Sequence, residues 1–154
     1  MCIRDRPIIK LTDDEQYAMN SYISGDAYVW NDKLRRGEKL TKLEKKKIKD
    51  MDSALEKMPA YQGTLYRSVS DFGIDDVQEF INSHVPGKKI SFPEYLSSST
   101  SVYDETFPIQ YVIQSKTGHD IRKFNSAEKE ILFSRDSMFI VKKIVGNIIH
   151  MEEI

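Results

Sequence analysis

Apolar and polar positions in the first sixty residues of the chain follow the period of an α-helix. Between Leu43 and Met58 apolar residues recur at near-helical spacing, and Pro59 stops the pattern. Two Thr-x-x-Glu capping boxes mark helix starts, at Thr12–Glu15 and Thr41–Glu44. The pattern therefore predicts three helices, over about 12–23, 26–37 and 41–58.

After Tyr61 the pattern changes to short β-rich runs separated by Gly, Pro, Asn, Asp or Ser. One short helix is predicted among them, over 75–82. The predicted strands are 63–69, 89–92, 108–114, 130–133, 138–146 and 147–153. Helices first and strands later, without βαβ alternation, favour an α+β fold with a mixed or antiparallel sheet. We expect one domain over residues 11–154, after an N-terminal tail at 1–10.

Composition excludes several classes of function. The net charge of −1 offers no general attraction for nucleic acid or anionic membrane, and apolar runs such as Met138–Val141 are too short to span a bilayer. One cysteine, Cys2, and three scattered histidines favour neither a disulfide framework nor a metal site. The N-terminus has no apolar signal segment. We therefore expect a protein that acts in the cytoplasm, or one that is secreted or delivered into a host cell by a route this chain does not encode.

Three short stretches are candidates for chemistry, and each also has an ordinary interpretation. Arg67 lies in a predicted strand, where it either faces water at a sheet edge or grips phosphate in a cleft. The hydroxyl-rich run Tyr95–Ser101 is either a loop or a strand end that orients a carboxylate. Glu128 and Glu130 are either two solvated glutamates or a pair that meets positive charge, since i and i+2 positions of a strand share a face.

The order and spacing of these stretches resemble the Arg-Ser-Glu class of mono-ADP-ribosyltransferases, which includes clostridial binary-toxin components and phage-encoded enzymes. The segments at 22–35 (YISGDAYVWNDKLR) and 48–69 (IKDMDSALEKMPAYQGTLYRSV) are also similar to that family. The resemblance implies a split mixed β-sandwich preceded by helices, with NAD as co-substrate in its cleft and no metal. It further implies cleavage of the nicotinamide–ribose bond and transfer of ADP-ribose to a protein acceptor.

The resemblance also implies roles for the catalytic residues. Glu130 matches the glutamate that stabilises the developing ribose cation, and Ser97 matches the serine that orients it. Glu128 matches the residue that positions an acceptor guanidinium, which favours arginine as the target. Two frames of the serine run fit the family pattern, and the preceding Tyr-Leu pair favours Ser97–Ser99 over Ser99–Ser101.

Cofactor and acceptor contacts are implied in the same way. Arg67 would hold the NAD diphosphate, and backbone groups at Ser68 would hold the nicotinamide amide. Other residues with family counterparts near NAD are Asn31, Tyr28, Ser99 and Phe107. Tyr28 stands one position later than the family's aromatic, and Phe107 fits either nicotinamide stacking or a place in the core. The loop at 119–130 would meet the acceptor, with Phe124 as its exposed aromatic.

Two other functions stay open at this point. An NAD glycohydrolase would use the same site with water as acceptor. A non-catalytic module that binds NAD or a protein would keep only the fold. The family pattern favours a bacterial or phage effector or toxin domain. We expect no receptor-binding or translocation region in a chain of this length.

Overall fold

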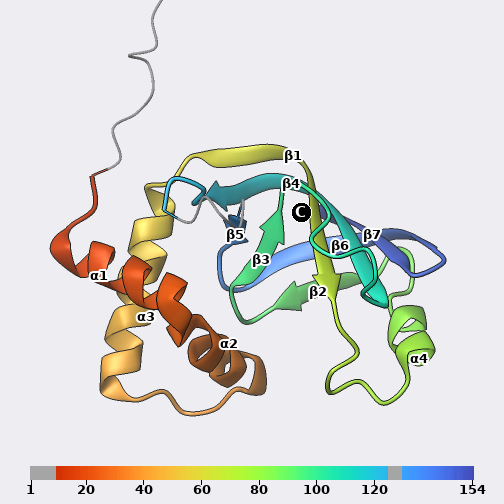
Figure 1. Ribbon diagram of the computed structural model, residues 1–154, viewed down its shortest axis with the longest axis horizontal. Helices are drawn as coiled ribbons and strands as arrows, with labels where there is room; N and C mark the ends of the chain where they lie inside the picture. The colour runs from red at the N-terminus through yellow and green to blue at the C-terminus, as the bar shows by residue number, and fades with distance from the viewer. Residues whose placement is uncertain (1–9, 125–129) are drawn as a thin grey trace, which may run out of the picture. The chain divides into compact units, whose positions relative to one another are not determined.

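The computed structural model describes residues 10–124 and 130–154, which form an α+β fold with N-terminal helices followed by a mixed sheet (Figure 1). The predicted fold class is therefore confirmed. The chain divides into two compact units, Met1–Pro59 and Ala60–Ile154. Within the described ranges, no helix is both long and apolar enough to span a membrane.

The first unit contains the three predicted helices. They are α1 (Asp13–Ser21), α2 (Ala27–Arg36) and α3 (Lys42–Glu56), with a π-helical turn, η2 (Tyr22–Asp26), between the first two. Both predicted capping boxes form. Gly25 separates α1 from α2 because its φ of 125° is incompatible with a helix and is readily adopted only by glycine. Gly37 ends α2 in the left-handed conformation, as a helix C-terminus commonly requires.

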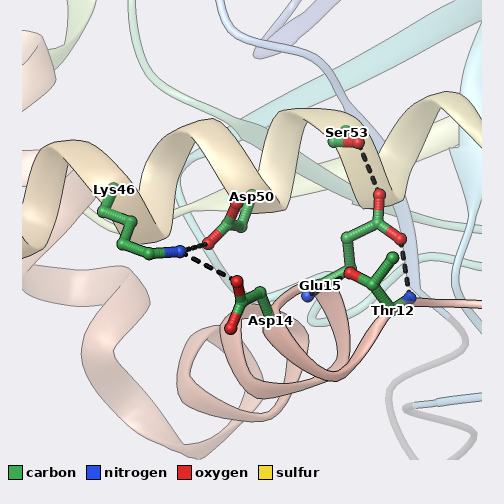
Figure 2. A network of polar contacts seen from close by, with 6 residues as sticks. All are labelled: Thr12, Asp14, Glu15, Lys46, Asp50 and Ser53. Carbon is green, nitrogen blue, oxygen red and sulfur yellow. Dashed lines mark hydrogen bonds and ion pairs between the residues drawn. The ribbon is translucent and has the colours of Figure 1, made fainter.

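A buried glutamate joins the start of α1 to the end of α3 (Figure 2). Glu15 is 4% exposed, and its carboxylate accepts hydrogen bonds from Thr12 N at 2.8 Å, Ser53 Oγ at 2.5 Å and Lys57 Nζ at 2.6 Å. Burial raises the pKa of Glu15, but the bonds from Lys57, Ser53 and Thr12 outweigh it and hold the pKa at about 2. The charged carboxylate is therefore part of the packing between the two helices.

The second unit is a seven-stranded sheet with one short helix, α4 (Val77–Asn82). Its strand order is β1-β3-β5-β4-β7-β6-β2, with β1 also paired to β4. All pairs are antiparallel except β4–β7. The strands are β1 (Ala60–Val69), β2 (Lys89–Phe92), β3 (Leu96–Ser99), β4 (Ile109–Asp120), β5 (Glu130–Phe133), β6 (Ser137–Val145) and β7 (Ile148–Glu153).

Strand β4 connects the two parts of the sheet. Its residues 110–114 pair with β7, whereas His119 and Asp120 pair with β5, and β1 runs along its other side throughout (Figure 1). Between these two stretches the β1–β4 register shifts, which marks a β-bulge in β4. A single apolar core then draws on both parts of the sheet, from Leu65 of β1 to Met151 of β7.

The bulge in β4 has a dedicated hydrogen-bond acceptor. Glu153, at the end of β7, is 5% exposed and accepts from the backbone N–H groups of Lys116 and Thr117 at 2.6 and 2.7 Å. The hydroxyl of Thr117 donates to the same carboxylate. Backbone N–H groups that a bulge removes from the strand ladder need other hydrogen-bond acceptors, and the carboxylate of Glu153 is that acceptor here.

We predict that Glu15→Gln lowers the free energy of unfolding at pH 7 by roughly 1–3 kcal/mol, because the ion pair with Lys57 is lost inside the helix contact. The folded-state pKa is depressed from 4.5 to about 2, so the wild-type advantage is complete above pH 4.5 and disappears as the pH falls toward 2. Urea unfolding at several pH values measures the difference. Asp13→Asn removes an exposed charge from the same helical turn and is the control. Equal pH dependence of the two variants would contradict the assignment.

We predict that Glu153→Ala destabilises the fold by roughly 2 kcal/mol, because two backbone donors of the bulge lose a charged acceptor. The matched control is Glu152→Ala on the same strand. Glu152 has a 3.7 Å ion pair with Lys142 and a side chain that is 40% exposed, so its loss should cost less than about 1 kcal/mol. Thermal or urea unfolding compares them, and similar losses would show that the bulge does not depend on Glu153.

Candidate active site

Arg67 lies on a strand with neighbours on both sides. In β1 it pairs with Tyr111 of β4, while the adjacent Tyr66 pairs with Ser99 of β3. The half-buried Arg67 side chain donates from Nη1 to the backbone oxygen of Ser97 at 2.9 Å. The interpretation of Arg67 as a water-facing residue at a sheet edge is therefore wrong.

The hydroxyl run forms a strand, β3, so its interpretation as a loop is also wrong. Alternation along the strand turns Leu96 and Ser98 toward the buried side, and Ser98 Oγ donates to the backbone oxygen of Ile131 at 2.8 Å. Ser97 and Ser99 lie half-buried on the other face. Ser101, the last serine of the alternative frame, is exposed and follows the strand.

Glu130 is the first residue of β5 and pairs directly with Ser99 across the β3–β5 ladder. Ser97 pairs with Leu132, two residues further along. Ser97, Ser99 and Glu130 therefore share one face, with side chains about 5–8 Å apart at their Cβ atoms. Glu130 is 7% exposed, so the interpretation as a solvated glutamate is wrong for this residue. Glu128 lies outside the described residues.

The sheet thus brings together three segments that are about thirty residues apart in the chain. Arg67 contacts the backbone of β3, and β3 carries two serines beside the buried carboxylate of Glu130. Gly118 allows β4 and β5 to lie close to each other, since a Cβ at this position would lie only 2.9 Å from Cγ2 of Ile131 in β5. A guanidinium and a buried carboxyl group are therefore held on the two strands that flank β3. The β1–β3 register places Tyr66 on the face of Ser99, and Arg67 reaches β3 through the backbone of Ser97.

Two further residues, Tyr111 beside Arg67 and His84 behind Tyr111, could not be recognised from the sequence. Tyr111 is 4% exposed and its hydroxyl lies 2.8 Å from Nε2 of His84, which is itself buried. Burial raises the pKa of Tyr111 to about 12, with Arg67 opposing the rise and Glu94 adding to it. The alternation of β4 could have indicated that Tyr111 faces inward with Ile113. Nothing in the sequence indicated its partner 27 residues away.

Ser68 anchors the loop that follows β3. Its hydroxyl donates to Gln110 Oε1 at 2.7 Å and accepts from Asp104 N at 3.2 Å, and Gln110 Nε2 donates to the backbone oxygens of Asp104 and Phe107. Phe107 is half-buried, lies outside the apolar core and contacts the ring of Tyr103 at a centroid distance of 6.1 Å. Its interpretation as a core residue is therefore wrong, and stacking on nicotinamide stays a prediction.

Two of the predicted cofactor residues, Asn31 and Tyr28, lie on α2 of the helical unit. Asn31 Nδ2 donates to the hydroxyl of Tyr22 at 3.3 Å, so its side chain is oriented within that unit. Tyr28 is 84% exposed. A role in NAD binding stays a prediction for both.

The predicted acceptor loop is described as far as Phe124. Asp120 and Arg122 form a bidentate ion pair, with N–O distances of 3.0 and 2.7 Å, and Arg122 lies over the ring of Tyr61. Phe124, predicted to be the exposed aromatic of this loop, is half-buried, and its N–H donates to Ile121 O at 2.9 Å. In the part of the chain that the structure describes, no group of three or more His, Cys, Asp or Glu residues is arranged to hold a metal ion.

Solved structures with the same fold include two ADP-ribosyltransferases from Paenibacillus larvae, the toxins Plx2a and C3larvin. Exoenzyme S from Pseudomonas aeruginosa, solved with human 14-3-3 protein beta and bound to carba-NAD, has a TM-score of 0.76 at 21% identity, over 93% of this chain and 74% of its own. The Clostridium limosum C3 exoenzyme has a TM-score of 0.75 at 20% identity, over 95% of this chain and 87% of its own.

The enzymatic component C2-I of the Clostridium botulinum C2 toxin is also similar. Its TM-score is 0.75 at 20% identity, over 94% of this chain and 44% of its own. At these identities the likeness establishes the fold. Among curated protein sequences, no relative matches the chain.

A family-level sequence comparison goes further than the fold. The sequence model of the ADP-ribosyltransferase exoenzyme family matches residues 8–152. This range is nearly the whole chain and includes every residue of the candidate site. The chain belongs to the ADP-ribosyltransferase exoenzyme family.

Proposed function

We propose that this protein is an NAD-dependent mono-ADP-ribosyltransferase that modifies arginine on a protein. The observation that carries the proposal is the convergence of three adjacent strands: Arg67 of β1 donates to the backbone of β3, and Ser97 and Ser99 of β3 share a face with Glu130 of β5. It supplies a planar cation for a diphosphate and a buried carboxylate for a sugar that becomes positively charged.

In this proposal Arg67 binds the NAD diphosphate through its guanidinium, which matches phosphate oxygens in a bidentate manner. Backbone groups of Ser68 bind the nicotinamide amide, and Phe107 stacks on the ring. Ser99 is proposed as a further cofactor contact in the sheet, and Asn31 and Tyr28 of the helical unit are proposed from the family resemblance alone. The carba-NAD bound to exoenzyme S supports NAD as the ligand of this fold.

The proposed reaction begins with heterolysis of the bond between nicotinamide and the ribose. The nicotinamide leaves as a neutral heterocycle with the bonding electron pair, so the ribose gains oxocarbenium character. Glu130 accepts a hydrogen bond from the ribose 2′-hydroxyl and stabilises the positive charge, while Ser97 orients the carboxylate. A preorganised charge in a site of low water content stabilises a transition state more effectively than water does.

Transfer is completed by the acceptor. A guanidinium nitrogen forms the new bond to the ribose carbon and releases one proton, for which Glu128 is the proposed base. This step needs Glu128 near the acceptor and Glu130 near the ribose, so the two glutamates have different roles. With water as the nucleophile, the same intermediate would give free ADP-ribose.

We predict that Glu130→Gln lowers the turnover number for nicotinamide release by about a hundredfold or more, because one electrostatic group acting mainly on the transition state is removed. The KM for NAD should change little. Release of nicotinamide from labelled NAD, measured over a range of NAD concentrations, gives both constants. Glu105→Gln, in the exposed part of the loop after β3, is the matched control and should retain wild-type turnover. Wild-type turnover in Glu130→Gln would exclude the mechanism.

We predict that Glu128→Ala keeps NAD hydrolysis within a few-fold of wild type and loses transfer to arginine, because only the acceptor step needs this carboxylate. Agmatine, a small guanidine, serves as the acceptor, and labelled ADP-ribosyl-agmatine is separated from free ADP-ribose. Equal loss of both products would place Glu128 in the cleavage step, against the proposal.

The same assays distinguish the other two functions. Nicotinamide release without labelled protein or labelled agmatine in the wild type indicates an NAD glycohydrolase. No release at all, together with NAD binding, indicates a non-catalytic module. The toxins and effectors that share the fold support an effector acting in a host cell as the setting.

A further inference from the structure

Arg67 is held between two strands by different kinds of contact. On one side its guanidinium donates to the backbone oxygen of Ser97 in β3. On the other side it is the register partner of Tyr111 in β4, so the two side chains leave the sheet on the same face, about 5 Å apart at Cβ. A change at Tyr111 therefore acts directly on the surroundings of the guanidinium.

Tyr111 is in turn held by His84, which follows α4. The backbone oxygen of Phe80 can only accept a hydrogen bond, so His84 Nδ1, at 2.9 Å, carries the proton. In the neutral imidazole Nε2 is then the acceptor for the Tyr111 hydroxyl at 2.8 Å. The rings of His84 and Tyr111 also meet edge to face at 5.5 Å. The phenol thus has one fixed orientation, set by a ring that is itself fixed.

The charge state of the phenol agrees with this direction of the hydrogen bond. Burial raises the pKa of Tyr111 to about 12, the charge of Arg67 opposes this rise, and Glu94 adds to it. The hydroxyl therefore stays protonated at neutral pH and donates a hydrogen bond to Nε2 of His84. Its oxygen then has only acceptor capacity left for other neighbours, which suits a position beside a guanidinium.

We propose that Tyr111 and His84 are positioning residues for NAD binding: they hold Arg67 in its binding orientation before the dinucleotide arrives. This inference rests on the proposed function, in which Arg67 binds the diphosphate. An arginine side chain has several rotatable bonds, and fixing them in advance removes an entropic penalty from ligand binding. Neither residue needs to touch the reacting atoms.

The test is Tyr111→Phe, which keeps the ring and removes the hydroxyl. We expect the KM for NAD to rise about tenfold and the turnover number to stay within twofold. The interaction of Arg67 with the diphosphate contributes equally to binding in the ground state and in the transition state, so weakening it affects the KM alone. In an Arg67→Lys background the same change should add nothing to KM, since no guanidinium remains to be positioned. An unchanged KM in the single variant, or a full tenfold rise in the Arg67→Lys background, would overturn the inference.

Variants of His84 provide a second test, in which a substitution that keeps the hydrogen-bonding groups is compared with one that removes them. His84→Ala should raise the KM as Tyr111→Phe does. His84→Gln, whose amide still offers N–H donors and an oxygen acceptor, should restore the KM at least in part. Val141→Ala, in the core on β6, is the stability control. It should lower the melting temperature to a similar extent and leave the KM unchanged. A KM that follows the melting temperature across all these variants would show a merely structural role.

A failure of the proposed function can be distinguished from a failure of the positioning role. If the wild type releases no nicotinamide, the function itself fails, and positioning is then judged in the NAD-free protein. There the ¹⁵N signals of the Arg67 guanidinium should show slowed rotation in the wild type and faster rotation in Tyr111→Phe. Identical Arg67 signals in the two proteins would overturn the positioning role independently of any activity.

Discussion

The antiparallel register between β3 and β5 is the constraint on which the candidate site depends. It sets Ser99 opposite Glu130 and leaves Ser97 on the same face. Because side chains alternate along a strand, a slip of one residue would turn Ser98 toward Glu130 and both other serines away from it. The buried bond from Ser98 Oγ to the backbone oxygen of Ile131 opposes such a slip, since it connects the two strands from the other face. The middle serine therefore has a structural reason to be a hydroxyl residue.

This register in turn depends on how β4 reaches β5. A straight β4 would continue beside β7, and the bulge before Gly118 instead separates the stretch paired with β7 from the stretch paired with β5. Glu153 takes the backbone donors that the bulge releases. The last residues of the sheet thus stabilise a change of direction in its central strand. A small sheet is in this way divided into two parts that share one core, which is the arrangement expected of a split sandwich.

The sequence allowed prediction of the helices and most strands because those signals are local. The capping boxes at Thr12 and Thr41 act within a few residues, and both form as predicted. The serine run was ambiguous because hydroxyl residues suit loops, caps and strands alike, and only pairing with β5 decides among them. The link between His84 and Tyr111 could not be predicted, since it joins residues 27 positions apart through a register that the sequence does not display. Phe107 failed as a core residue because hydrophobicity alone does not distinguish a core position from a loop tied to a strand by Ser68.

The proposed chemistry would explain why the sheet buries polar side chains at positions where apolar side chains would cost less free energy to bury. Burying charged side chains such as Arg67 and Glu130 costs free energy unless each gains a compensating interaction. In the proposed function, NAD would bring an anionic diphosphate to Arg67 and, in the transition state only, a cationic ribose to Glu130. An interaction that strengthens as the bond breaks accelerates the reaction, whereas a diphosphate contact improves binding alone. The two charged residues would then differ in kind: Arg67 governs affinity, and Glu130 governs rate. In the same proposal the hydrogen-bonded pair Tyr111 and His84 would contribute to affinity, because an Arg67 side chain that is already ordered in the free protein loses less entropy when the dinucleotide binds.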